Sequence, residues 1–184
     1  MRKQLSYLVL MLLTALPVIG ETVVPIFSDD FNTVGLFAEN WKATKGVKPE
    51  NGKLSLDNGK SIRLRRLVKG DFAISVDIAA FKAKDHKFGF CGVDIDGIKF
   101  LIRMDGKAWV VYRLPGEKHS KGHIANIDRF ETGKFNKVYI SRQQLSSAVK
   151  YVYKVNGRQV ASFVVSNMPQ KNAITVLSYR MNCI

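Results

Sequence analysis

Acidic residues are scarce in this sequence. There are 15 Asp and Glu residues against 29 Lys and Arg residues, which gives a formal net charge of +14. The five glutamates all fall in expected loops or termini: Glu21, Glu39, Glu50, Glu117 and Glu131. A chain this basic favours acidic partners such as nucleic acid, anionic lipid or acidic polysaccharide. Solubility accompanied by non-specific binding is the simpler explanation of the same charge.

Cysteine is almost absent. Cys91 and Cys183 are the only two, which excludes a cysteine-rich disulfide scaffold, and their spacing carries no metal-binding signature. In an oxidising compartment the two are expected to pair and so tie a mid-chain strand to the C-terminal one. Two buried free thiols fit the sequence equally well, because free cysteine is often buried.

Long apolar runs are also missing, with one exception at the N-terminus. Arg2 and Lys3 precede an apolar stretch from Leu8 to Val18, and small residues follow up to Gly20. This pattern predicts a secretory signal peptide over residues 1–20, hence a secreted or periplasmic protein; an uncleaved anchor is the alternative. Cleavage after Gly20 removes two positive charges and no acid, which lowers the net charge to +12.

Export has consequences for partners. It argues against nucleic acid as the physiological target, and no membrane contact is expected beyond the signal peptide. We expect residues 21–184 to form a single domain, and the sequence does not determine its oligomeric state.

Helical periodicity is rare after residue 20. Short runs alternate apolar and polar residues between turn residues, which predicts an all-β protein, an antiparallel two-sheet jelly-roll sandwich. Five Asx-Gly pairs support this, because Asn, Asp and Gly tolerate the positive φ of tight type I′ hairpins. Three of them lie between good strand candidates and predict hairpins: Asp96-Gly97, Asp105-Gly106 and Asn156-Gly157.

The alternation also predicts how the strands are grouped. Residues 72–114 are expected to form a four-strand meander and residues 137–166 a second meander, followed by a last strand over residues 173–181. Residues 115–130 lack any period and are predicted to be a long loop. Shorter strands are expected at 26–31, 41–44, 53–56 and 61–67.

Several segments together resemble a known superfamily. The opening "FSDDFN", Trp41, "GKLSL", "DFAISVDIAAF" and the hairpin "YKVNGRQVASF" resemble the concanavalin A-like lectin/glucanase superfamily, and laminin G-like domains of secreted bacterial proteins look most similar. The resemblance implies a secreted, non-enzymatic, lectin-like carbohydrate-binding module. Alternatives from the same superfamily are a glycoside hydrolase-type enzyme, similar to 3-keto-disaccharide hydrolases, and a structural cell-envelope or adhesion protein.

A hydrolase of this kind needs two carboxylates at the scissile bond. Its relatives carry them as E-x-D-x-E or E-x-D-x-x-E on one strand, and neither pattern occurs here. Asp94 and Asp96 have a spacing of two, but they adjoin Gly97, and the turn explains Asp96. The "NSG" segment typical of 3-keto-disaccharide hydrolases is replaced by "HKFGFCG". We therefore assign no catalytic residue.

Outward-facing strand positions supply the predicted binding residues. Sugars are bound by aromatic platforms and planar hydrogen-bonding groups, and Arg binds carboxylate or sulfate through two parallel hydrogen bonds. Arg103, Trp109, Tyr112 and Arg113 are the predicted ligand-binding residues, with Trp109 and Arg113 on one strand face and Tyr112 on the other. A Trp or Tyr in a strand that serves only in packing is the alternative.

The segment "RLRR" is the main basic cluster. Arg63, Arg65 and Arg66 within it are predicted to bind anions, which makes an acidic polysaccharide the expected carbohydrate. A basic strand edge that blocks aggregation is the alternative.

Structural calcium is the one cofactor expected. Asp29 and Asp30 offer hard oxygen ligands for it, although the same residues could simply flank a strand.

Overall fold

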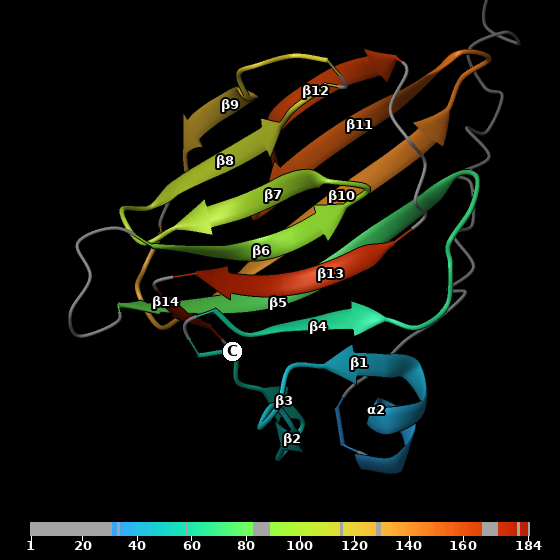
Figure 1. Cartoon of the computed structure of the whole chain (residues 1–184). Helices are drawn as coiled ribbons and strands as arrows, with labels where there is room; N and C mark the ends of the chain where they lie inside the picture. Colours follow the sequence, from blue (N-terminus) through green and yellow to red (C-terminus); the bar gives the residue numbers. More distant parts are fainter. Residues whose placement is uncertain are drawn as a thin grey trace, which may run out of the picture.

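Two antiparallel sheets pack face to face and form most of the molecule (Figure 1). This computed structural model describes residues 31–32, 34–57, 59–82, 89–114, 116–127, 130–166, 173–179 and 181–183. The predicted signal peptide therefore lies outside the described residues, as do residues 26–30 of the predicted strand at 26–31 and the predicted calcium ligands Asp29 and Asp30. The predicted all-β sandwich is confirmed.

The front layer in Figure 1 is a seven-stranded sheet of order β1-β4-β13-β6-β7-β8-β9. Its strands are β1 (Trp41–Ala43), β4 (Ser61–Leu64), β6 (Phe90–Ile95), β7 (Ile98–Arg103), β8 (Lys107–Tyr112), β9 (Lys121–Asn126) and β13 (Ile174–Tyr179). The back layer is a five-stranded sheet of order β12-β11-β10-β5-β14. Its strands are β5 (Phe72–Lys82), β10 (Phe135–Gln144), β11 (Ala148–Val155), β12 (Arg158–Ser166) and β14 (Met181–Cys183).

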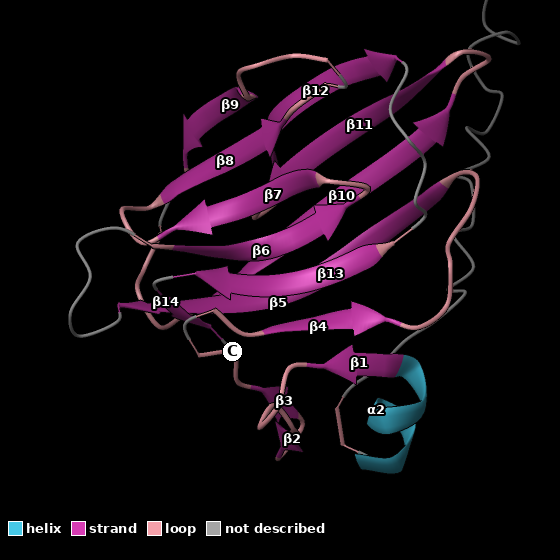
Figure 2. Cartoon of the chain, in the orientation of Figure 1, coloured by secondary structure: helices cyan, strands magenta, loops and turns pink. Residues whose placement is uncertain are grey.

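A short helix and a small hairpin lie at the β1 end of the sandwich. The hairpin pairs β2 (Pro49–Glu50) with β3 (Lys53–Leu54), and the helix is α2 (Val34–Asn40), shown in cyan beside β1 in Figure 2. The helix was not predicted, because two turns are too short to show a helical period. Its Phe37 is buried, 6.1 Å from the Phe31 ring, and so seals the edge of the core.

The Asx-Gly pairs behave as their chemistry predicts. Asp96 and Gly97 both have positive φ (57° and 90°), as do Asn156 and Gly157 (51° and 81°), and each pair forms the tight turn of a hairpin. At Asp105-Gly106 only the glycine has positive φ (77°), and the β7–β8 connection is three residues long. All three predicted hairpins are therefore present.

Two predictions of strand grouping were wrong. Residues 72–114 do not form one four-strand meander, because β5 pairs with β10 and β14 in the back sheet. The chain crosses between sheets after β5, and the true meander is β6-β7-β8-β9. Residues 115–130 are not wholly a loop, because they contain β9. This edge strand is exposed on most positions of both faces, so it has no apolar alternation to detect.

The core lies between the two sheets and is built by strand alternation. On β11, Val149, Tyr151, Tyr153 and Val155 point inward and are buried, while the intervening residues face outward. The Tyr153 hydroxyl donates a hydrogen bond across the sandwich to the Leu101 carbonyl oxygen at 3.1 Å. Among the described residues, no helix is long and apolar enough to cross a membrane.

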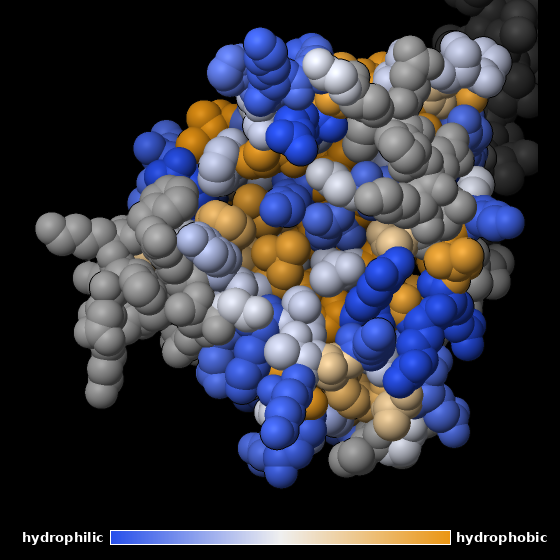
Figure 3. All heavy atoms as spheres, viewed as in Figure 1, coloured by the Kyte–Doolittle hydropathy of each residue, from blue (hydrophilic) through white to orange (hydrophobic). Residues whose placement is uncertain are grey.

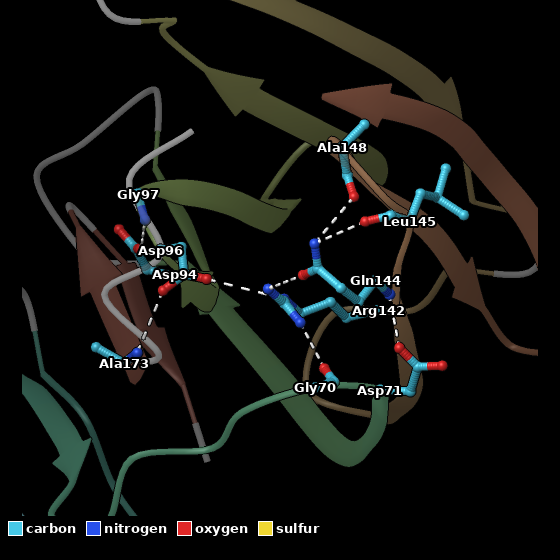
Figure 4. Close-up of polar contacts among 10 residues, drawn as sticks. All are labelled: Gly70, Asp71, Asp94, Asp96, Gly97, Arg142, Gln144, Leu145, Ala148 and Ala173. Carbon is cyan, nitrogen blue, oxygen red and sulfur yellow. Dashed lines mark hydrogen bonds and ion pairs between the residues drawn. The ribbon is translucent and has the colours of Figure 1, made fainter. Parts of the chain in front are cut away.

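A buried ion pair links the sheets at one end of the core (Figure 4). Asp96, in the β6–β7 turn, lies with its Oδ2 3.9 Å from the Nε of Arg142 on β10, and the two residues are 6% and 1% exposed. Arg142 also donates to the Gly70 carbonyl oxygen and to Gln144 Oε1. Asp96 Oδ1 accepts from the backbone N–H of Ala173 at 3.3 Å.

Candidate functional site

An aromatic strip crosses the outer face of the seven-stranded sheet. We define it as Tyr179, Phe90 and Trp109, on β13, β6 and β8, with Ile124 of β9 at its end. The Phe90 ring stacks on Tyr179 at 5.1 Å and meets Trp109 edge-to-face at 6.1 Å. Tyr179 is 42% exposed and Ile124 53% exposed, so both ends of the strip reach the surface. With strands about 4.8 Å apart, the strip runs roughly 19 Å across the sheet.

A buried leucine lies beneath the strip. Leu101 on β7 points to the outer face, opposite Gly92 on one side and Trp109 on the other, yet it is only 1% exposed. Phe90 and Trp109 belong to the strands on either side of β7, so their ring contact passes over Leu101 and accounts for its burial. Loss of either ring would expose this leucine, because the strip covers its own apolar base.

A shallow depression of about 310 Å³ adjoins the Trp109 end of the strip. Arg103, Trp109, Val111, Gly122 and Ile124 line it. Gly122 is essential to its shape, since a Cβ there would lie 2.6 Å from the Val110 carbonyl oxygen and 3.0 Å from Trp109 Nε1. The glycine thus lets β9 approach the indole.

Cations share the outer face with the strip. Arg103 lies with its guanidinium 5.7 Å from the Trp109 ring centroid, and Asp105 holds it through a 2.9 Å ion pair. Further along this face a cross-strand row places Lys99, Arg63 and Lys42 outward on β7, β4 and β1. These three are exposed and form no ion pair with the described residues. Asp94 lies opposite Lys99 in the same row, so the row carries three cations and one acid, and an anionic ligand on this face would meet a net positive charge.

A further ion pair lies at the rim of the depression. Lys121 Nζ is 2.7 Å from Glu117 Oε1, and this hydrogen bond and charge raise the pKa of Lys121 above its usual range. The charges of Lys121 and Glu117 offset one another, so this pair adds no net charge at the rim.

Three of the seven predicted sugar- and anion-binding residues share this face: Arg63, Arg103 and Trp109. Arg113 is exposed just beyond the end of β8. Tyr112 points to the opposite face of β8 and stacks on Phe163 of β12 at 5.2 Å, between the sheets. The structure thus separates Tyr112 from the other predicted ligand-binding residues.

The rest of the "RLRR" segment lies beyond β4. Arg65 Nε donates to the carbonyl oxygens of Ala38 and Trp41, both at 3.1 Å, and so satisfies the C-terminal end of α2 and the start of β1. Arg66 is exposed in the following bend. Of the three predicted anion-binding residues, Arg63 is the one that the register places on the same outer face as the aromatic strip, four residues along the sheet from the row of Tyr179 and Phe90.

Carboxylates are scarce on this face. Among the outward positions of the described strands in the seven-stranded sheet, Asp94 is the only acid, and its Oδ1 accepts from the Gly97 N–H at 2.8 Å. Asp96, which has the matching spacing in sequence, points into the core toward Arg142. The pair therefore does not flank a common cleft.

The predicted metal and disulfide sites remain predictions. Among the described residues, no three His, Cys, Asp or Glu side chains gather where they could hold a metal ion. Cys91 is buried on β6, and Cys183 belongs to β14, which pairs with β5 in the opposite sheet. A disulfide between them would join the two layers.

Comparison with solved structures identifies the architecture. The chain is similar to an endo-1,3-beta-glucanase from Streptomyces sioyaensis (TM-score 0.63, 11% identity, covering 88% of this chain and 84% of that one). It is also similar to porphyranase B from Zobellia galactanivorans (0.58, 10%, 84% and 87%) and to the carbohydrate binding module CBM66 from Bacillus subtilis (0.53, 9%, 79% and 91%). The chain has the concanavalin A-like jelly-roll fold. Against protein-family models and curated protein sequences, the chain matches none.

Enzymes and binding modules both use this jelly roll, so the fold alone does not select between them. The similarity to laminin G-like domains stays a prediction. Phe90 and Tyr179 were missed as site residues, although strand alternation places Phe90 on the outer face. The position of Tyr179 beside Phe90 depends on β13 pairing with β6, two strands about 85 residues apart in the chain, which no local pattern reveals.

Proposed function

We propose that this protein is an exported carbohydrate-binding module that holds acidic polysaccharide on the outer face of its seven-stranded sheet. The aromatic strip is the observation that carries the proposal. It offers stacking surface for sugar rings, while Arg103 next to Trp109, and Lys99 and Arg63 further along the same face, offer donors for carboxylate or sulfate groups. Figure 3, which views this face, shows hydrophobic and hydrophilic residues side by side across it.

The arrangement fits binding better than bond cleavage. Hydrolysis of a glycosidic bond normally uses two carboxylates at a separation of about 5 to 10 Å. The described strands of this face carry Asp94 alone, and that residue is engaged with the β6–β7 turn. The predicted signal peptide agrees with a role outside the cell or in the periplasm.

A glycan array with the protein lacking residues 1–20 tests the proposal. Neutral and acidic sugars are compared at two salt concentrations, and binding to acidic sugars should weaken at the higher salt. Salt-independent binding would contradict the anionic part of the proposal. Release of reducing ends from any bound polymer would contradict the non-enzymatic part, and no binding at all would favour a structural role.

Two variants locate the site. Trp109→Ala should weaken binding at least about tenfold, since buried aromatic anchors commonly contribute 2 kcal/mol or more. Leu67→Ala, at a 60% exposed loop residue off this face, is its control and should bind normally. Arg63→Gln should reduce affinity for acidic sugars and flatten the salt dependence, whereas Lys69→Gln in the loop after β4 should have little effect. Equal losses from variant and control would contradict the assignment of this face.

A further inference from the structure

A second cationic surface lies on the opposite side of the sandwich. The outer face of the five-stranded sheet presents Lys137 and Tyr139 from β10 and Lys150 and Lys154 from β11, and we call this group the lysine face. Their inward neighbours, such as Val138 on β10, are buried core residues. The four side chains therefore point away from the core and from the aromatic strip.

The register fixes the spacing of these charges. Lys154 lies directly opposite Tyr139, with its Nζ 5.6 Å from the ring centroid. Lys137 is a diagonal neighbour of Lys154, about 7–8 Å away. Lys150 lies four residues along β11 from Lys154, roughly 13 Å. The three ammonium groups thus form a row along the hairpin rather than a single compact pocket.

Little on this face neutralises the lysines. None of the three forms an ion pair with a described residue. Asp77, which faces Lys137 from β5, is the only acid at the described outward positions of β5, β10, β11 and β12. The neighbouring outward positions carry Ser141 and Gln143 on β10, while Val152 lies between Lys150 and Lys154 on β11.

We propose that the lysine face is a second binding site, for a linear polysaccharide carrying carboxylate or sulfate groups. A row of charges along a hairpin suits an extended polyanion, and the hydroxyl of Ser141 and the amide of Gln143 on the neighbouring strand suit its sugar hydroxyls. The lysines lie in mid-strand, with no protruding apolar loop among them to enter a bilayer, which favours a polymer over a membrane surface.

Two sites on opposite faces give the protein a further activity. The sheets of a sandwich lie about 10 Å apart, so chains on the two outer faces do not collide. One molecule would then hold two polysaccharide chains together and cross-link them. The cross-linking rests on the proposed function of the aromatic strip, whereas binding to the lysine face does not.

Binding is tested with dextran sulfate and polygalacturonate as probes and neutral dextran as the blank. The triple variant Lys137→Gln/Lys150→Gln/Lys154→Gln is combined with Trp109→Ala, so that the aromatic strip is disabled. Its control carries the same loss of charge at exposed lysines outside the strands: Lys45→Gln/Lys69→Gln/Lys118→Gln, also with Trp109→Ala. The lysine-face variant should bind at least tenfold more weakly than the control. Equal affinity of the two would overturn the proposal, because net charge alone would then explain binding.

Two further measurements test the location of the site and the kind of ligand that it binds. Asp77→Asn removes the acid of this face and should tighten binding to dextran sulfate at least twofold, whereas Asp57→Asn elsewhere should tighten it less; equal effects would count against the site. Vesicles containing anionic lipid form a separate arm. Loss of vesicle binding without loss of polymer binding in the triple variant would assign the face to membranes and overturn the polysaccharide proposal.

Turbidity of protein–polymer mixtures reads out the cross-linking. The wild-type protein should make dextran sulfate solutions turbid, and the lysine-face triple variant with Trp109 intact should bind without turbidity. Turbidity that persists in this variant would contradict the two-site arrangement. If Trp109→Ala leaves affinity unchanged while the lysine-face variant lowers it, the proposed function of the strip fails and the lysine face stands.

Discussion

The buried pair of Asp96 and Arg142 makes a sharp prediction about stability. We consider Asp96→Asn, which keeps the size of the side chain and its Oδ1 acceptor for the Ala173 N–H. Asn also tolerates the positive φ of 57° at this turn position, so the hairpin is preserved. The substitution therefore removes one negative charge and little else. The guanidinium of Arg142, only 1% exposed, is left in the core without its counter-charge.

The expected loss of unfolding free energy follows from the burial of Arg142. Removing one partner of a buried ion pair typically costs about 3–5 kcal/mol, because the remaining charge stays desolvated. For a domain of this size, each kcal/mol lowers the thermal midpoint by about 2–4 °C, so we expect a fall of roughly 6–20 °C. Urea unfolding followed by tryptophan fluorescence and by circular dichroism would measure the free energy of unfolding.

The matched control is an exposed pair. Asp57 lies 3.3 Å from Lys60 with 61% of its side chain exposed, and Asp57→Asn should cost less than about 1 kcal/mol. The double variant Asp96→Asn/Arg142→Met should lose less free energy of unfolding than the two single variants lose together, and the difference should be at least about 1 kcal/mol. A loss below 1 kcal/mol for Asp96→Asn, or strict additivity, would refute the claim that this pair stabilises the fold as a buried ion pair.

Three other predictions concern packing, pH and the cysteines. Gly122→Ala should displace β9 from the indole of Trp109, weaken glycan binding at least threefold and shift tryptophan emission. The control Gly35→Ala, whose Cβ would meet nothing within 4 Å, should leave binding and emission unchanged. Normal glycan binding by Gly122→Ala would contradict this packing. Burial raises the pKa of Tyr153 far above its usual value near 10, so the folded state retains a proton that the unfolded chain loses. Its contribution to stability is therefore complete below about pH 10 and declines as the pH rises further, and absorbance titration should show this tyrosine ionising only on unfolding. In exported protein, non-reducing mass spectrometry should find Cys91 joined to Cys183, and two free thiols would overturn the pairing.

Local chemistry was enough to predict much of the fold. The alternation along β11, with Tyr151 and Tyr153 inward and Lys150 and Lys154 outward, is visible in the sequence because side chains of a strand alternate between its two faces. The hairpins at Asp96-Gly97 and Asn156-Gly157 were equally accessible, since few residues other than Asn, Asp and Gly accept positive φ. Edge strand β9 escaped detection because it buries neither face.

For the binding surface, the sequence by itself determined which side chains of one strand share a face, and so placed Trp109 with Arg113 and opposite Tyr112. It also determined the excess of cations and the lack of carboxylate pairs. Only the tertiary structure decided which strands are neighbours. Pairing of β13 with β6 brings Tyr179 to Phe90, and pairing of β5 with β10 places Asp77 opposite Lys137 in the other sheet. Strand register between distant segments depends on the packing of the whole sandwich, which no local sequence pattern encodes.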